Sequence, residues 1–251
     1  MKYIILVMLL ISPAFAASST VIDQATQKPI PFAKITIPQQ NYSTYTDENG
    51  KFNLDAKIDN QSIISVEKEG YRPYSLTIDS NSASKPLIMG VEKSESPDIV
   101  LDTGVIHIGD DSYAQTSANS GEFKAKSVGP FYTKTFKMSA DALKRENYLI
   151  IGSLIGLDTK LAHEMGQNRV VNSYASPTEI FFNGNKIAEL QLNGDGQRVK
   201  LPNNLIRPDT TNEITIKTGK NMMQTAYIDY DDIEVMNLSI QSGKTSIGYS
   251  D

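Results

Sequence analysis

The sequence has no cysteine and no tryptophan, and only two histidines among its 251 residues. Without cysteine the chain can form no disulfide framework, thiolate metal site or cysteine nucleophile, and it can carry no lipid anchor on a cysteine. Hydrolytic triads and zinc centres draw on histidine, and neither His107 nor His163 stands in a sequence motif of that kind. The composition therefore favours a protein that is not an enzyme.

Basic residues are in the minority, with 24 Lys and Arg against 29 Asp and Glu and a formal net charge of -5. Such a field repels the phosphate backbone of nucleic acids, so nucleic acid is not an expected partner. Hydrophobic residues make up 39% of the chain, which is enough to bury the core of one large or two ordinary domains. Disorder is therefore not expected.

Long apolar runs are rare, and the clearest one lies at the N-terminus. Lys2 precedes an apolar run at 4–11, and Ala14-Phe15-Ala16 has the small-x-small pattern of a cleavage site. This pattern predicts a signal peptide over residues 1–16 and a periplasmic or extracellular protein. A membrane anchor is the alternative, but the run is shorter than the roughly 18 residues that a span requires. No later segment is long enough to cross a membrane either.

Short β-type segments bounded by turn residues recur along the rest of the chain, which predicts an all-β fold. A charged, proline-ended linker at 91–97 divides two β-sandwich domains, at 17–90 and 98–242, and a tail follows at 243–251. Helix is expected only at 139–146 and 159–165. The expected strands are 19–22, 33–37, 43–46, 51–54, 62–67 and 74–78, then 131–137, 148–156, 178–182, 186–191, 197–201, 212–217 and 233–240; a tight turn is expected at 193–196.

The first domain resembles the carboxypeptidase regulatory-like domain, a small transthyretin-like β-sandwich. The resemblance rests on an ordered set of motifs rather than on any single one: residues 21–26, 28–35, 45–52, 63–66 and 69–71. Phe32 departs from it, because a small residue usually stands there. The resemblance implies a folding or docking module without catalytic residues of its own.

The second domain resembles the galactose-binding-like jelly roll of carbohydrate-binding modules. The motifs that carry this resemblance are 179–187, 197–202, 205–206, 211–216 and the acidic last strand at 230–235. The resemblance implies sugar binding by loop residues in many members of the family. It also implies, in many members, a structural calcium held between an early strand and the last strand.

Polar and aromatic side chains gather in two parts of the second domain. Hydrogen-bonding groups and an aromatic face are what a sugar site requires, so we expect these residues to bind a ligand. A short surface helix with a solvated face is an equally good explanation for the second group. The predicted ligand-binding residues are Asp110, Asp111, Tyr113 and Asn119 near the start of the domain, and His163, Arg169 and Tyr174 in the long stretch 157–177.

Acidic residues at the start and the end of the second domain suggest a metal site. Calcium prefers six to eight oxygen ligands, carboxylates among them. Under the resemblance, Glu122, Asp231 and Asp232 are the predicted ligands, with Asp232 as the best match for the last-strand ligand. The alternative is that these are turn and edge-strand carboxylates that face water and discourage edge pairing.

Two functions from different classes are favoured over a third, a hydrolase that acts on polysaccharides. The first is an exported, non-enzymatic protein that binds a glycan through its second domain. The second is a structural or adhesion component of the cell envelope that binds another protein. A tyrosine-lined groove beside residues 157–177 favours the first, whereas an exposed apolar patch or an open strand edge favours the second.

Overall fold

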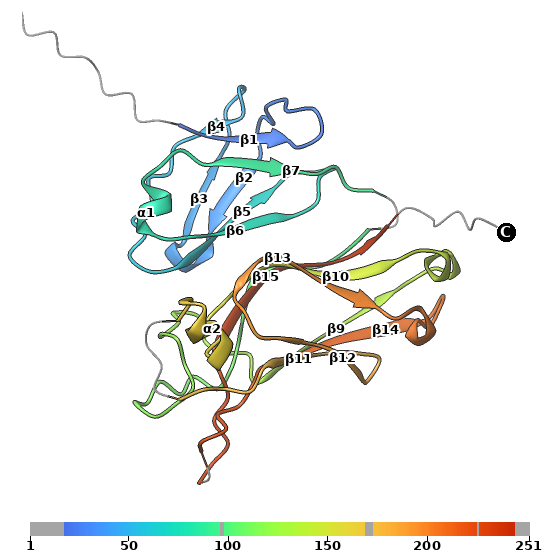
Figure 1. Ribbon diagram of the computed structural model, residues 1–251. Coiled ribbons are helices and arrows are strands. Elements are labelled where there is room, and N and C mark those ends of the chain that lie inside the picture. Colours follow the sequence, from blue (N-terminus) through green and yellow to red (C-terminus); the bar gives the residue numbers. More distant parts are fainter. Residues whose placement is uncertain (1–17, 96–97, 169–172, 225, 244–251) are drawn as a thin grey trace, which may run out of the picture.

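The computed structural model describes residues 18–243 except 96–97, 169–172 and 225. Its strands form four sheets, which stack as two sandwiches (Figure 1). The prediction of an all-β fold with two sandwich domains is therefore confirmed. The predicted signal peptide, Arg169 and nearly all of the predicted tail lie outside the described residues. Within the described part of the chain, no helix has the length and hydropathy of a membrane span.

The first sandwich packs a three-stranded sheet against a four-stranded one. The sheet orders are β4-β1-β7 and β3-β2-β5-β6. Residues along a strand alternate between the two faces, and β2 shows this plainly, since Ile35 and Ile37 are buried while their neighbours are partly exposed. The strands are β1 Ser19–Asp23, β2 Lys34–Ile37, β3 Tyr42–Tyr45, β4 Lys51–Phe52, β5 Ser62–Glu67, β6 Tyr74–Ile78 and β7 Ile88–Val91.

The second sandwich is built from two four-stranded sheets, β13-β10-β15-β8 and β12-β11-β14-β9. If the strands of this sandwich are renumbered with β8 as strand 1 and β15 as strand 8, the sheet orders become 6-3-8-1 and 5-4-7-2. This is the strand order of a jelly roll. Its core contains Leu149, Ile180, Phe182, Ile216 and Val235 among others. The strands are β8 Ile99–Ile108, β9 Phe131–Lys137, β10 Asn147–Ile155, β11 Thr178–Phe182, β12 Asn185–Leu190, β13 Gly194–Leu201, β14 Thr211–Lys217 and β15 Ile233–Ser242.

The helices are all short. Two of them, the 3-10 helix η2 Ala140–Lys144 and α2 Lys160–Glu164, fall where helix is expected. Thr159 caps α2, since its side chain accepts a hydrogen bond from the N–H of Ala162. The remaining helices are α1 Ser80–Ala83 and the 3-10 turns η1 Pro38–Gln40 and η3 Asn203–Leu205.

The structure differs from the expected strands in three places. Two of the differences are β7 and β8, which the sequence analysis did not predict as strands. The expected turn at 193–196 is partly strand, because β13 begins at Gly194. The physical reason lies in Asp195, whose carboxylate accepts hydrogen bonds from the N–H and hydroxyl of Thr77 on the first sandwich. These bonds favour an extended backbone over a tight turn at this position.

The two sandwiches pack directly against each other through β5 and β6 on one side and β10, β13 and β15 on the other (Figure 1). The hydroxyl of Ser153 contacts the hydroxyl of Ser75 at 2.9 Å and donates to Asp195 at 2.6 Å. A small apolar cluster of Ile63, Ile155 and Met236 lies in the same joint. This packing explains why β15 is buried along nearly its whole length, with both of its faces covered.

Glu234 lies buried in this joint and gives the fold an expected pH dependence. Burial raises the pKa of its carboxyl above the ordinary 4.5, against the opposing effects of the Gln39 amide at 2.8 Å and of His107. The carboxyl has its ordinary pKa in the unfolded chain and a raised pKa in the folded protein. The folded protein therefore loses stability as the pH rises from the ordinary pKa through the raised one.

Glu234→Gln removes this charge and keeps the shape. We expect the melting temperature of the variant to exceed that of the wild type by about 3 °C at pH 7 and to equal it near pH 4. Thermal unfolding followed by circular dichroism at the two pH values measures the difference. A variant that melts below the wild type at pH 7 would show that the charged carboxylate is favoured in the joint.

Candidate functional site

Four loops meet at one end of the second sandwich, at residues 109–130, 156–177, 191–193 and 218–232. Each of them follows a strand, β8, β10, β12 or β14, that ends at this edge of the fold (Figure 1). All but one of the predicted ligand-binding residues are in the described parts of the first two loops. We call the region where these four loops meet the loop end.

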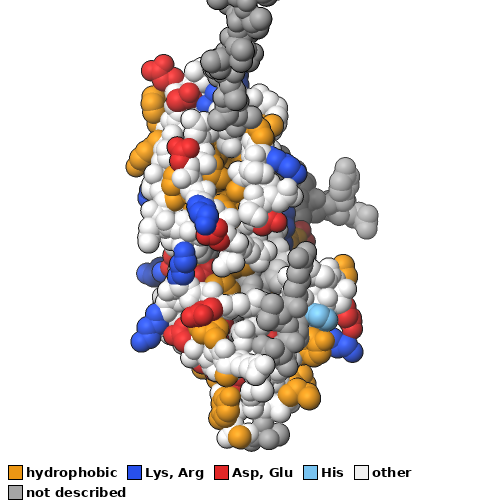
Figure 2. Space-filling view, turned by 90° about the vertical axis from the view of Figure 1, so that its left-hand side faces the viewer, with side chains coloured by type: hydrophobic (Ala, Val, Ile, Leu, Met, Phe, Trp, Pro, Cys, Tyr) orange, Lys and Arg blue, Asp and Glu red, His pale blue; other side chains and the backbone are white. Residues whose placement is uncertain are grey.

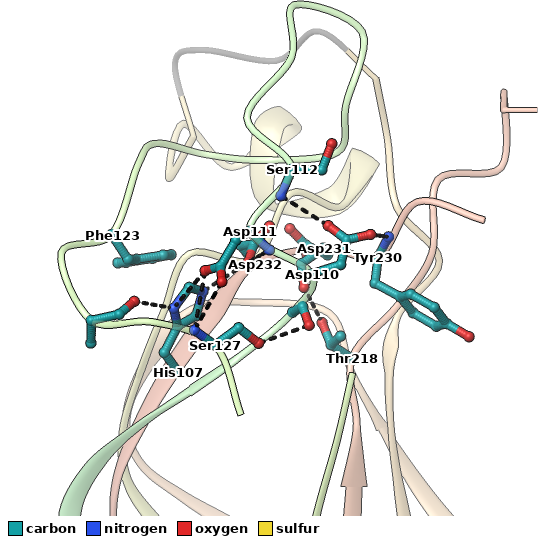
Figure 3. Close-up of polar contacts among 12 residues, drawn as sticks. His107, Asp110, Asp111, Ser112, Phe123, Ser127, Thr218, Tyr230, Asp231 and Asp232 are labelled. Carbon is teal, nitrogen blue, oxygen red and sulfur yellow. Dashed lines mark hydrogen bonds and ion pairs between the residues drawn. The ribbon is translucent and has the colours of Figure 1, made fainter. Parts of the chain in front are cut away.

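Asp110 and Asp111 are exposed but engaged in hydrogen bonds that join the loops (Figure 3). Asp110 accepts from the backbone N–H of Tyr230 at 2.9 Å and of Ser112 at 3.0 Å. Asp111, in the left-handed region with φ 57°, accepts from the N–H of Ser127 at 3.1 Å. Both carboxylates thus hold the loop end together and still present oxygen atoms at its surface.

His107, at the end of β8, is buried and forms an ion pair with the buried Asp232 (Figure 3). The distance from Nε2 to Asp232 Oδ1 is 2.8 Å, and Nδ1 contacts the carbonyl oxygen of Ala125. Burial by itself would lower the pKa of the imidazole, but these two hydrogen bonds and the charge of Asp111 outweigh it and raise the pKa. Both ring nitrogens face acceptor oxygens, so the imidazole is fixed in place by contacts within the fold.

The same residues form a compact group of possible metal ligands. The ligand atoms of His107, Asp111 and Asp232 all lie within 4.8 Å of one another. The imidazole already lies between the two carboxylates and, when it is protonated, supplies the positive charge that a metal ion would bring. A side chain at Gly109 would collide with Asp232, so glycine is required there for this close packing.

The predicted metal ligands separate in the structure. Asp231 and Asp232 are fully buried at the start of β15, whereas Glu122 is exposed in the 109–130 loop and is not part of the group just described. Asp232 forms the ion pair with His107 described above. The predicted set of Glu122, Asp231 and Asp232 is therefore not brought together, although calcium binding itself stays a prediction.

Asp231 belongs to a second group of buried carboxylates, which the sequence did not predict as a group. Asp158, Asp229 and Asp231 are all 0% exposed. Burial, together with the charge of Asp229, raises the pKa of Asp158 to about 7 against a hydrogen bond from the Asn119 backbone. Burial raises the pKa of Asp231 as well, and the charges of Asp158, Asp232 and Asp229 add to this effect. Asp158 lies three residues after the buried end of β10 at Ile155, a position that could have marked it in the sequence.

The other predicted ligand-binding residues are partly used within the fold. Asn119 is buried, and its amide donates to the carbonyl of Ser117 at 3.1 Å. Tyr113 is half-buried, and burial followed by the charge of Asp232 raises the pKa of its hydroxyl. His163 and Tyr174 form a ring pair with centroids 5.9 Å apart, and His163 is exposed on α2. Only part of this set can therefore reach a ligand.

A shallow cleft of about 330 Å³ lies beside these loops. Its lining combines Tyr227, which is 53% exposed, with amide, ammonium and hydroxyl groups. Hydrophobic side chains gather at this lower end of the molecule in Figure 2. The residues of this cleft are not among the predicted ligand-binding residues, although Tyr227 lies in a loop between two strands. The lining residues are Ser176, Lys220, Asn221, Met222, Gln224, Tyr227, Ile228 and Asp229.

Comparison with known families bears on the first sandwich. Residues 18–100 match the CarboxypepD_reg-like domain. The predicted resemblance is thereby confirmed for this sandwich. No curated protein matches the chain. For the second sandwich, the galactose-binding-like resemblance stays a prediction. The jelly-roll strand order is compatible with it.

Solved structures resemble the chain only distantly. A β-D-glucuronidase from Dictyoglomus thermophilum is similar over 61% of this chain and 29% of its own, with 13% identity and a TM-score of 0.32. A putative membrane-associated protein of unknown function from Bacteroides fragilis NCTC 9343 is similar over 90% of this chain and 96% of its own, with 11% identity and a TM-score of 0.23. Likenesses this low carry no argument about function.

Proposed function

We propose that this chain is an exported, non-enzymatic binding protein that recognises a carbohydrate through the loop end of its second sandwich. The observation that carries the proposal is the cleft beside Tyr227. A sugar presents an apolar ring face and a rim of hydroxyls, so it is bound by an aromatic ring flanked by hydrogen-bonding groups. The exposed ring of Tyr227, with Lys220, Asn221 and Gln224 beside it, offers this combination.

Two further features support this role. The imidazole of His107 is buried with both nitrogens engaged, which leaves it without the free nitrogen that general base catalysis requires. The CarboxypepD_reg-like domain would serve as a spacer or docking module, and the predicted signal peptide would place the protein in the periplasm or outside the cell.

Replacing Tyr227 with alanine is expected to weaken polysaccharide binding at least about 5-fold, because truncating a central aromatic contact commonly costs over about 1 kcal/mol. Affinity electrophoresis in gels that contain soluble polysaccharides measures the loss. Tyr45→Ala is the matched control, because Tyr45 is 61% exposed on the first sandwich. Equal retardation of both variants would contradict a site at Tyr227.

The second candidate is a structural or adhesion component that docks onto an envelope protein. A specific observation favours it, since Met222, Met223 and Ile228 are 75%, 77% and 63% exposed in the loop between β14 and β15. Exposed apolar groups of this kind mark protein contacts more often than sugar contacts. Met223→Ser separates the candidates, because Met223 does not line the cleft. It should weaken binding to an envelope protein and leave the tyrosine-dependent glycan binding intact.

A further inference from the structure

Phe32 combines an exposed aromatic ring with a backbone conformation that disfavours it. Its φ is 54°, in the left-handed region that is costly for a bulky residue. The side chain is 60% exposed, lies outside the core of the first sandwich and pairs with no other aromatic ring among the described residues. Phe32 therefore costs stability without packing the fold, and strain of this kind is typical of ligand-binding sites.

Phe32 lines a groove of about 500 Å³ at the boundary of the two sandwiches. Tyr45 on β3, which is 61% exposed, lines the groove too, and so does Val100 on β8 of the second sandwich, which is 52% exposed. Three large side chains that expose apolar surface thus share one groove, where a single ligand could cover them.

The groove runs across the strands of the first sandwich rather than along an edge. Lys34 on β2 lies opposite Tyr45 on β3 and Glu67 on β5, and all three residues line the groove. Such a row spans two strand spacings, or about 9.6 Å. A ligand that follows this row cannot extend the sheet through main-chain hydrogen bonds, so it must be held by side chains.

We propose that this groove binds a proline-rich segment of another protein in the polyproline II conformation. That helix repeats every three residues, or about 9.3 Å, which matches the row of side chains. Its proline rings dock into aromatic-lined grooves, and because the helix is preformed, little conformational entropy is lost on binding. Phe32 and Tyr45 would supply the aromatic wall.

The charges of the groove favour an uncharged ligand. The lining contains two cations, Lys34 and Lys68, and two anions, Glu67 and Glu69. In the part of the chain that the structure describes, none of the four forms an ion pair. An acidic or basic segment would be attracted by one pair and repelled by the other, whereas an uncharged proline-rich segment meets no repulsion.

This site gives a ligand class to the docking role proposed for the first sandwich. No residue lines both this groove and the cleft beside Tyr227. Peptide binding and glycan binding can therefore be measured separately on the same chain, and the failure of one proposal leaves the other standing.

The test is fluorescence anisotropy of two labelled peptides titrated with the full chain, decaproline and a flexible Gly-Ser decapeptide. The wild type should bind decaproline and not the flexible peptide. Tyr45→Ala and Phe32→Gly should each weaken decaproline binding at least about 5-fold. Phe131→Ala, which removes a ring that is 50% exposed on the second sandwich, should leave the affinity unchanged.

Thermal unfolding separates a binding role of Phe32 from a structural one. Glycine adopts a positive φ without strain, so Phe32→Gly should melt at or above the temperature of the wild type although it binds less peptide. A variant that melts well below the wild type would contradict the assignment of Phe32 to ligand binding.

Two further results would overturn the proposal. One is a wild type that binds neither peptide at about 1 mM, or binds both equally. The other is unchanged decaproline affinity in both Tyr45→Ala and Phe32→Gly. A glycan-array signal that is lost in Phe32→Gly would assign the groove to sugars instead.

Discussion

Replacing His107 with leucine is expected to lower the free energy of unfolding by about 3–5 kcal/mol, because it leaves the carboxylate of Asp232 buried without its partner. Both residues are almost completely buried, at 2% and 0% exposed, and no water can take over the role of the imidazole without opening the loop end. The carbonyl of Ala125 loses its donor as well. Urea denaturation measures the change.

His163→Leu is the matched control, since it removes the other histidine of the chain. That ring is exposed and contacts the carbonyl of Asn168 at 3.0 Å, so the expected loss is within about 1 kcal/mol. If His107→Leu does not fold, His107→Gln keeps one donor and should fall between the wild type and the leucine variant. Equal losses for His107→Leu and His163→Leu would show that the buried ion pair adds no stability.

The second large effect is expected at the joint between the sandwiches. A Cβ at Gly152 would lie 2.6 Å from Ser75 Oγ and 2.7 Å from Asn237 Cβ. Gly152→Ala should therefore push β6 away from β10 and lower the free energy of unfolding by about 1–3 kcal/mol, as overpacking does. Urea denaturation measures the loss, and small-angle scattering should show a larger radius of gyration.

Gly90→Ala, on β7 of the first sandwich, provides the comparison. A Cβ there would meet its nearest atom, Gln24 Cβ, at 3.7 Å, which is an ordinary contact. We expect this variant to stay within about 0.5 kcal/mol of the wild type. A Gly152→Ala variant with the radius of gyration and stability of Gly90→Ala would mean that the sandwiches are not held in one arrangement.

Much of the fold could be predicted because most strands are buried on one face and bounded by turn residues. β8 escaped because it has Asp102 and Gly104 in its middle, where its register with β15 is interrupted and Asn237 takes a positive φ. β7 is short and contains Gly90. The packing of the sandwiches depends on contacts between residues far apart in sequence, such as Thr77 and Asp195, so periodicity could not reveal it.

The site could be predicted as a region rather than as a set of contacts. Asp110, Asp231 and Asp232 stood out because they lie in acidic clusters beside expected strands. Asp158 is a lone acidic residue in its own segment, and its proximity to Asp231 follows from the jelly-roll topology. His107 stands in no triad or zinc motif, and its pairing with Asp232, 125 residues away in sequence, could not be seen in the sequence. Tyr227 could not be separated from the other tyrosines by sequence alone, because exposure depends on the fold.

A glycan array probed with the wild type, Tyr227→Ala and Tyr45→Ala tests the central claim most directly. We expect the wild type and Tyr45→Ala to bind the same defined glycans, and Tyr227→Ala to lose that signal. Folded wild type that binds no glycan across a broad array would contradict carbohydrate recognition and favour the envelope-protein partner. Binding that survives in Tyr227→Ala would contradict the assignment of the cleft at the loop end.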